Sequence, residues 1–342
     1  MLPPKVYSSP PPIAADASVE QVGATEFSTL HQDIIESHVL TRLDGPSLAS
    51  AASCSTTLRH LSSPENLWSD ICHYTWPSTV SSSVSHVISK FPNGGPRAFF
   101  SHAFPLLSSS NLNRSSSSQP SELISSVDIH YKDNLIFSKV QETETSTEWF
   151  RCSPFRIDLL EPKDVVPTPI KHPDRDENCN QIITDMRLSW ILIDPIGLRA
   201  VNLSSQKPVT VQRHWLTGEV QVRFASILAV DRGHVQCGIV VTCGGSESGE
   251  MQVREVSLEM EDMDGMHLNG KDSLVILHGA LEGRKGSGRN RVQEAQRRYK
   301  EYVEMKRERK ERKLKREGVL DMLCVAFGVS IFLGFCCFLF CR

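Results

Sequence analysis

Residues 322–341, which stand directly before the C-terminal arginine, contain no charged side chain. An α-helix rises about 1.5 Å per residue, so a helix of this length spans roughly 30 Å, the thickness of the hydrocarbon core of a bilayer. Lipid cannot hydrogen-bond the backbone, and a single segment inside it must therefore be helical. The run also lacks the polar face that a helix on a soluble core would show. The sequence predicts a single transmembrane helix, a tail anchor, over residues 319–342.

A strongly basic segment precedes this run. Residues 284–317 carry 15 Lys or Arg against 6 Glu, whereas residues 1–283 carry 21 Lys or Arg against 33 Asp or Glu. Residues 290–317 include no Gly or Pro, and several Glu residues stand four positions before a basic residue, an order that favours a helix. Few apolar residues interrupt the charges. We therefore expect a solvated helix in this part of the chain.

The basic helix has an expected role because it stands beside the apolar run. Positive flanks stay on the cytosolic side, which places the chain on the cytosolic face of a membrane, the endoplasmic reticulum or the plasma membrane. Anionic head groups attract such a segment by about 1 kcal/mol per basic residue near the surface. The expected membrane-surface residues are Lys306, Arg307, Arg309, Lys310, Arg312, Lys313, Lys315 and Arg316. A nucleic-acid patch is the alternative, but no aromatic residues interleave with these charges to stack on bases, so we expect membrane lipid and no nucleic acid.

The sequence has ten cysteines, but their placement does not predict a disulfide framework. Four lie in the apolar tail, and the other six are scattered without a CxxC pair or the Cys/His spacing of a zinc site. Residues 1–25 contain prolines at positions 3, 4, 10, 11 and 12 and no apolar segment of the kind that a secretory signal needs. We therefore expect reduced cytosolic thiols, no metal, no cofactor and a disordered N-terminus.

A Ser-rich stretch without hydrophobic periodicity separates two modules, and we interpret it as a flexible linker. The expected organisation is a disordered segment over 1–26, a helical module over 27–104, the linker over 105–125, a β-rich domain over 126–283, a basic juxtamembrane helix over 284–318 and the tail anchor over 319–342. The fold class is α+β.

Strand patterns dominate the second module. Apolar residues alternate with other residues over 220–230, 235–243 and 256–260, and residues 190–194 are apolar on both faces, as in a central strand. We expect a turn at 231–233. The Asn269-Gly270 pair between two short apolar runs is typical of a hairpin. These features predict an antiparallel β-sandwich or curled sheet of roughly six to nine strands.

Short helices dominate the first module. Apolar residues recur at helical spacing before Asp44, a helix of small residues follows Pro46, and a further helix places Leu67 and Trp68 on one apolar face. So few residues cannot bury this much apolar surface comfortably, which indicates a partner. A small helical core of its own is the alternative.

This stretch resembles an F-box. The residues that match the pattern of the family are Leu30, Ile34, Ile35, Val39, Leu40, Leu43, Asp44, Leu48, Leu58, Arg59, Leu67 and Trp68. One position departs from it, because His31 stands where the family has proline. With residues 213–227 included, the chain is similar to a plant group of F-box proteins that have an otherwise undescribed C-terminal domain.

The resemblance implies an adaptor function. F-box proteins bind a Skp-type adaptor, which joins them to a cullin and a RING subunit, and their C-terminal domain presents a protein substrate. The resemblance therefore implies that this chain is a substrate-recognition subunit of an SCF-type cullin-RING ubiquitin ligase, which the tail anchor would tether to a membrane. The adaptor-binding residues would be Leu30, Ile34, Ile35, Val39, Leu40, Leu43, Leu48, Leu58, Leu67 and Trp68. The resemblance thus implies that the helix of Trp68 faces partly outward, while Trp76 covers the core of its own module. A membrane-anchored binding or scaffold protein without a ligase role is the alternative.

Catalytic motifs are not evident in the sequence. The segment at 244–249 reads GGSESG and has Glu where a nucleophile elbow needs Ser, and the segment at 283–288 lacks the spacing of a phosphate-binding loop. No paired carboxylates or nucleophile and base are marked by spacing. We therefore expect a non-catalytic subunit.

Overall fold

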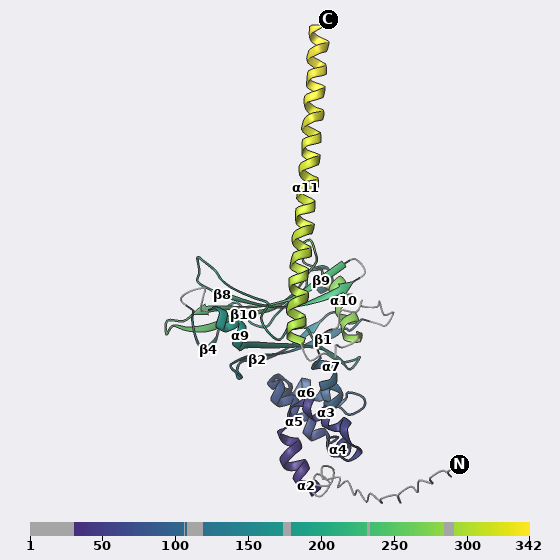
Figure 1. The fold of residues 1–342 in the computed structure, drawn as a ribbon, viewed down its shortest axis with the longest axis vertical. Coiled ribbons are helices and arrows are strands. Elements are labelled where there is room, and N and C mark those ends of the chain that lie inside the picture. Colours follow the sequence, from purple (N-terminus) through teal and green to yellow (C-terminus); the bar gives the residue numbers. More distant parts are fainter. Residues whose placement is uncertain (1–30, 106, 108–118, 174–178, 231–232, 284–290) are drawn as a thin grey trace, which may run out of the picture. The chain divides into compact units, whose positions relative to one another are not determined.

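The computed structural model describes residues 31–105, 107, 119–173, 179–230, 233–283 and 291–342 (Figure 1). The chain divides into two compact units, residues 1–64 and residues 65–342, and each is described here by itself. The expected disorder over 1–26, most of the Ser-rich linker, Leu30 and most of the turn at 231–233 lie outside the described residues.

The N-terminal unit consists of short helices. They are α2 (Gln32–Ile34), η1 (Ile35–Val39), η2 (Leu40–Arg42), α3 (Gly45–Cys54) and α4 (Thr56–Leu61). Side chains cap the two longer ones, since Asp44 accepts a hydrogen bond from the backbone N–H of Ser47 at 2.9 Å and Ser55 accepts one from Leu58 at 3.1 Å. The capping residues thus define where each helix begins.

The C-terminal unit begins with a helical part built around aromatic rings. Its elements are α5 (Glu65–Thr75), η3 (Pro77–Val80), α6 (Ser82–Ser89) and α7 (Pro96–Ala103). Trp68 lies 5.5 Å from Phe100, and Trp76 lies 5.9 Å from Phe99, between ring centroids. Edge and tilted ring pairs of this kind add to the stabilisation from burial. The apolar spacing in α5 therefore serves packing against α7.

Two antiparallel sheets follow. The four-stranded sheet has the order β2-β1-β5-β6, and the six-stranded sheet has the order β3-β10-β9-β8-β7, with β4 paired to β10. The strands are β1 (Glu122–Tyr131), β2 (Asn134–Glu144), β3 (Arg156–Asp158), β4 (Val166–Lys171), β5 (Met186–Asp194), β6 (Arg199–Asn202), β7 (Thr210–Arg213), β8 (Val220–Val230), β9 (Gly233–Gly245) and β10 (Glu250–Glu261). Short helices α8 (Glu148–Cys152) and α9 (Cys179–Asp185) lie between strands in the sequence.

One hydrophobic core takes side chains from both sheets. Trp190 of β5, Phe224 of β8 and Leu258 of β10 are all completely buried in it. The alternation predicted β8, β9 and β10 correctly, and β5 is a central strand between β1 and β6, as its two apolar faces indicate. The mixed helical and antiparallel fold is therefore confirmed. The described residues form ten strands, slightly more than expected.

A buried carboxylate ties the helical part to the first sheet. Asp128 of β1 is fully buried and accepts hydrogen bonds from the backbone N–H of Ser78 at 2.9 Å and from the hydroxyl of Ser138 at 2.8 Å. Burial raises the pKa of Asp128, while the hydrogen bonds from Ser78 and Ser138 act in the opposite direction. These bonds hold η3 against β1.

The expected hairpin at Asn269-Gly270 is wrong. Asn269 is instead the N-cap of α10 (Gly270–Glu282), and its side chain accepts a hydrogen bond from the backbone N–H of Asp272 at 2.8 Å. A Cβ at Gly270 would stand 2.1 Å from the carbonyl oxygen of Phe150, so only glycine fits there. The dipeptide that is typical of a hairpin turn therefore begins a helix here. Asn269 caps the helix, and Gly270 allows the backbone to approach the carbonyl group of Phe150.

The last element, α11 (Arg291–Phe340), is one continuous helix of 50 residues, drawn in Figure 1 as an uninterrupted coil that ends in yellow. The expectation of a fully solvated basic part is wrong. Tyr302 is completely buried, and its hydroxyl donates to the backbone carbonyl of Asp262 at 3.0 Å. The first half of α11 therefore packs on the β-sandwich. The second half is long and apolar enough to cross a membrane, judged by length and composition.

Candidate adaptor, membrane and substrate surfaces

The expected adaptor residues of the N-terminal unit differ in exposure. Ile34 and Val39 are exposed, at 44% and 37% of their surface. Leu43 and Leu58 are half-buried, whereas Ile35, Leu40 and Leu48 are buried. The exposed pair is available to a partner, and the buried residues shape the unit that presents it.

His31 occupies the position of the expected proline and is the N-cap of α2. Its φ of −61° and ψ of 138° are extended values that proline also adopts, and its Nδ1 accepts a hydrogen bond from the backbone N–H of Asp33 at 3.4 Å. Histidine in place of proline at position 31 therefore still caps the N-terminus of α2 with ordinary geometry.

The helix of Leu67 and Trp68 was expected to face partly outward, but both side chains are buried. Trp68 is only 2% exposed and Leu67 only 8%. The ring of Trp68 contacts Phe100, and the guanidinium of Arg97 lies 5.7 Å from its centroid. The apolar face of α5 is thus used inside the C-terminal unit, because α7 supplies aromatic partners that the sequence pattern did not reveal. Trp76 is buried as expected, and its indole N–H donates to the hydroxyl of Ser189 at 3.3 Å.

Three of the expected membrane-surface cations form ion pairs, and the others are exposed. Lys306 forms an ion pair with Glu261, and Arg309 forms one with Asp264 at 2.6 Å, so both contact the β-sandwich. Arg307 pairs with Glu304 at 2.6 Å within the helix. The remaining cations are exposed, and they are Lys310, Arg312, Lys313, Lys315 and Arg316.

A stripe of half-buried or buried residues explains how the basic helix docks. Val292, Ala295, Tyr299 and Tyr302 are spaced three or four positions apart and are all at least half-buried. Such spacing places them on one helix face. Sequence reasoning missed this stripe because charged residues outnumber it, although the spacing itself is visible.

Two adjoining hollows form a groove between the sheets. One measures about 480 Å³ and is lined by residues 135–139, Leu160 and residues 164–166. The other measures about 630 Å³ and shares Lys139 and Leu160 with the first. Its remaining lining residues are Gln141, Arg156, Asp158, Leu159, Glu161, Pro162, Glu219, Thr242, Arg254 and Glu255. No sequence motif marked this groove, because its walls come from segments that are far apart in the chain.

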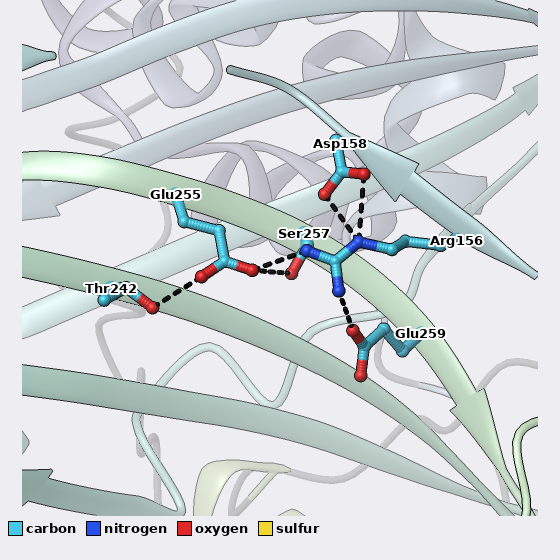
Figure 2. Close-up of polar contacts among 6 residues, drawn as sticks. All are labelled: Arg156, Asp158, Thr242, Glu255, Ser257 and Glu259. Atoms are coloured by element: carbon cyan, nitrogen blue, oxygen red, sulfur yellow. Dashed lines mark hydrogen bonds and ion pairs between the residues drawn. The ribbon is translucent and has the colours of Figure 1, made fainter. Parts of the chain in front are cut away.

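A guanidinium surrounded by carboxylates forms part of one wall (Figure 2). Arg156 bonds Asp158 at 2.8 Å and Glu255 at 2.6 Å and also pairs with Glu259. Partial burial is the largest single effect on Arg156 and opposes its charge, but the hydrogen bonds to Asp158 and Glu255 and the charges of the nearby carboxylates together outweigh it and raise the pKa of Arg156. Burial likewise opposes the charge of Glu255, but bonds from Thr242 and Arg156 lower its pKa. The cluster joins Arg156 of β3 to Glu255 and Glu259 of β10 and so holds these two strands together.

Three buried thiols of the C-terminal unit are held in their protonated form. Burial raises the pKa of the Cys72, Cys237 and Cys243 thiols to about 12, which makes them poor nucleophiles. Within the described ranges, no group of three His, Cys, Asp or Glu side chains could hold a metal ion.

Comparison with known proteins identifies relatives that match nearly the whole chain. The chain is 50% identical over 311 residues to the probable F-box protein At2g36090 of Arabidopsis thaliana, covering 90% of this chain and 91% of the relative. It is 41% identical to the Arabidopsis thaliana F-box protein At2g27310, covering 92% of this chain and 97% of the relative. It is also 41% identical to the Arabidopsis thaliana F-box protein At3g44326, covering 96% and 95%.

No family model matches the sequence, and no solved structure matches the fold. The three relatives are nevertheless similar over at least 90% of this chain, well beyond a short shared motif. The chain belongs to the F-box proteins.

Proposed function

We propose that this protein is the substrate-recognition subunit of an SCF-type cullin-RING ubiquitin ligase. The N-terminal unit binds a Skp-type adaptor, and through it a cullin and a RING subunit, while the β-sandwich holds a protein substrate. The observation that carries the proposal is the 50% identity to a probable F-box protein over 90% of this chain. In this mechanism no residue of the chain breaks a bond, because the receptor acts by raising the effective concentration of a substrate lysine near the ubiquitin thioester.

The burial pattern refines which residues contact the adaptor. Ile34 and Val39 are exposed apolar side chains of the N-terminal unit, and we propose them as direct contacts. Ile35, Leu40 and Leu48 then act by supporting the shape of that unit. Leu67 and Trp68 act by packing within the C-terminal unit, so their truncation would test folding before it tests binding.

We also propose that α11 anchors the protein in a membrane with both units on the cytosolic side. Support comes from the continuous helix, whose C-terminal part is long and apolar enough to cross a membrane and has no buried residue. The exposed cations Lys310, Lys313 and Lys315 precede the apolar run and suit anionic head groups. A membrane-anchored scaffold without a ligase role is the second candidate, since the same anchor and sandwich would serve it.

Copurification with a Skp-type adaptor tests the ligase proposal. The full chain in detergent should retain the adaptor, and the double variant Ile34→Asp with Val39→Asp should reduce retention at least about tenfold, because two charges replace apolar contact surface. The matched control is Ile196→Asp, which changes a side chain that is 71% exposed in the other unit. It should retain the adaptor fully.

Two outcomes would contradict the proposal. If the wild-type chain does not retain the adaptor although circular dichroism shows it folded, the scaffold function is the better one. If the Ile34 and Val39 variant binds as well as the control, the adaptor contacts lie elsewhere.

A further inference from the structure

We propose that the groove between β2 and the β3–β4 side of the second sheet binds an extended, basic segment of the protein substrate, which adds to β2 as a further strand. This inference rests on the proposed function, in that it gives the β-sandwich its substrate-binding surface and the class of segment it takes.

The first wall of the groove is a strand edge. Side chains of a strand point alternately to its two faces, so a hollow over one face touches every second residue. Here five consecutive residues of β2, 135–139, line the same hollow. The edge of the strand, with its backbone groups, must therefore face the groove. Among the described strands, β2 pairs only with β1, so its other side is open to a partner.

The second wall supplies apolar surface. Leu160 and Val165 lie across the groove from Leu135, and Leu135 and Val165 are 45% and 49% exposed. Both β3 and β4 pair with β10, which places them on one side of the second sheet. An extended segment lying along β2 would thus have its backbone at one wall and alternate side chains toward apolar surface.

The charges of the lining favour a basic occupant. Five carboxylates line the two hollows, from Asp158, Glu161, Asp164, Glu219 and Glu255, against three cations, from Lys139, Arg156 and Arg254. Arg254 pairs with Glu219 at 3.0 Å, and Arg156 is held by its carboxylate partners. In the described part of the chain, the exposed carboxylates of Glu161 and Asp164 form no ion pair. They are placed to receive a Lys or Arg side chain.

The same charges argue against a second copy of this chain as occupant. Pairing β2 with β2 of another copy would bring Glu142 and Glu144 to a groove that already has an excess of carboxylates.

Peptide binding to the full chain in detergent tests the proposal. The probes are fluorescein-labelled nonapeptides that alternate Val with Lys, or Val with Glu, measured by fluorescence anisotropy. We expect the Lys probe to bind at least about tenfold more tightly than the Glu probe, and more weakly at high salt. The double variant Glu161→Lys with Asp164→Lys should abolish this preference. The matched control, Glu148→Lys with Glu247→Lys, changes exposed carboxylates outside the lining and should keep it.

Backbone methylation separates strand addition from simple charge attraction. Two versions of the Lys probe carry N-methyl groups on alternate residues, one on the odd and one on the even positions. In an added strand only one set of N–H groups faces β2. One version should therefore lose at least about tenfold in affinity, while the other binds like the parent peptide.

Three outcomes would overturn the proposal. They are equal binding of both methylated probes, equal binding of the Lys and Glu probes, and no binding of the Lys probe at about 1 mM. A concentration-dependent dimer in sedimentation that Lys139→Glu alters would assign the edge to a second copy instead. Adaptor retention, measured separately, distinguishes these failures from failure of the ligase function, since it does not involve the groove.

Discussion

The two halves of α11 make opposite use of the same secondary structure. The first half carries charges on most sides, yet it has the one buried residue of the helix, Tyr302. The second half is almost entirely apolar, yet its apolar window has no buried residue. Burial in a protein therefore follows from complementary partners, here the carbonyl of Asp262 and the carboxylates of Glu261 and Asp264, and not from hydrophobicity alone. The unpartnered half suits a lipid solvent.

Removing the apolar half should have the largest effect. A chain truncated before residue 319 should move from the membrane pellet to the soluble fraction, because it loses the whole candidate span of α11. Cell fractionation at high salt measures this. Retention of the truncated chain in the pellet would show that the tail is not the anchor. The far smaller change Gly318→Ala, at an exposed helical position, is the control and should stay in the membrane.

Removing the buried ring of Tyr302 from the first half of α11 should have the next largest effect. It should weaken the docking of this helix on the β-sandwich and leave membrane attachment unchanged. Tyr302→Ala should cost about 3 kcal/mol of the free energy that holds the helix to the sandwich, because it leaves a cavity. Hydrogen exchange of the backbone amides at 295–305 should rise accordingly, with the pellet fraction unchanged. Val303→Ala is the neighbouring control, since Val303 is 44% exposed and should change neither quantity.

Alkaline pH should release the docked half specifically. Burial, reinforced by the nearby charges of Glu261 and Asp262, raises the pKa of Tyr302 above its ordinary value of 10.0. The docked state therefore holds the phenolic proton more tightly than the undocked state. Its stabilisation is complete below pH 10.0 and falls as the pH rises above that value toward the raised pKa. Hydrogen exchange at 295–305 should increase in this range by more than the intrinsic base-catalysed rate does, and Tyr302→Phe should remove this excess. An unchanged slope in that variant would assign the effect to another group.

The smallest effects should come from replacing single cations of α11, and they should differ between a cation in an ion pair and an exposed one. Lys306→Ala should cost at most about 1 kcal/mol of docking, since the ion pair with Glu261 is only partly buried. Lys313→Ala should leave docking unchanged and reduce affinity for vesicles containing phosphatidylserine by about 1 kcal/mol. Vesicle sedimentation and hydrogen exchange on both variants give the comparison. If Lys306→Ala weakens vesicle binding as much as Lys313→Ala does, Lys306 contacts lipid despite its partner.

Local patterns predicted the sheet well where burial is one-sided and regular. The alternation over 220–230 identified β8 with both of its ends, because Val220, Val222, Phe224 and Leu228 all pack in the shared core. The Asn269-Gly270 pair misled because turn and helix-cap chemistry use the same residues, and only the closeness of Phe150 decides between them. Trp68 misled for a related reason, since an apolar helix face does not specify whether α7 or a partner protein covers it.

The sequence by itself determined the elements that depend on neighbours along the chain: the alternating strands, the short capped helices of the N-terminal unit and the long apolar run, together with the F-box resemblance. Only the tertiary structure decided which surfaces remain for partners. It buried Trp68 and left Ile34 exposed, docked the basic helix through Tyr302, and opened a groove along β2. The physical reason is that periodicity specifies which face of an element is apolar, whereas what covers that face depends on residues distant in the sequence.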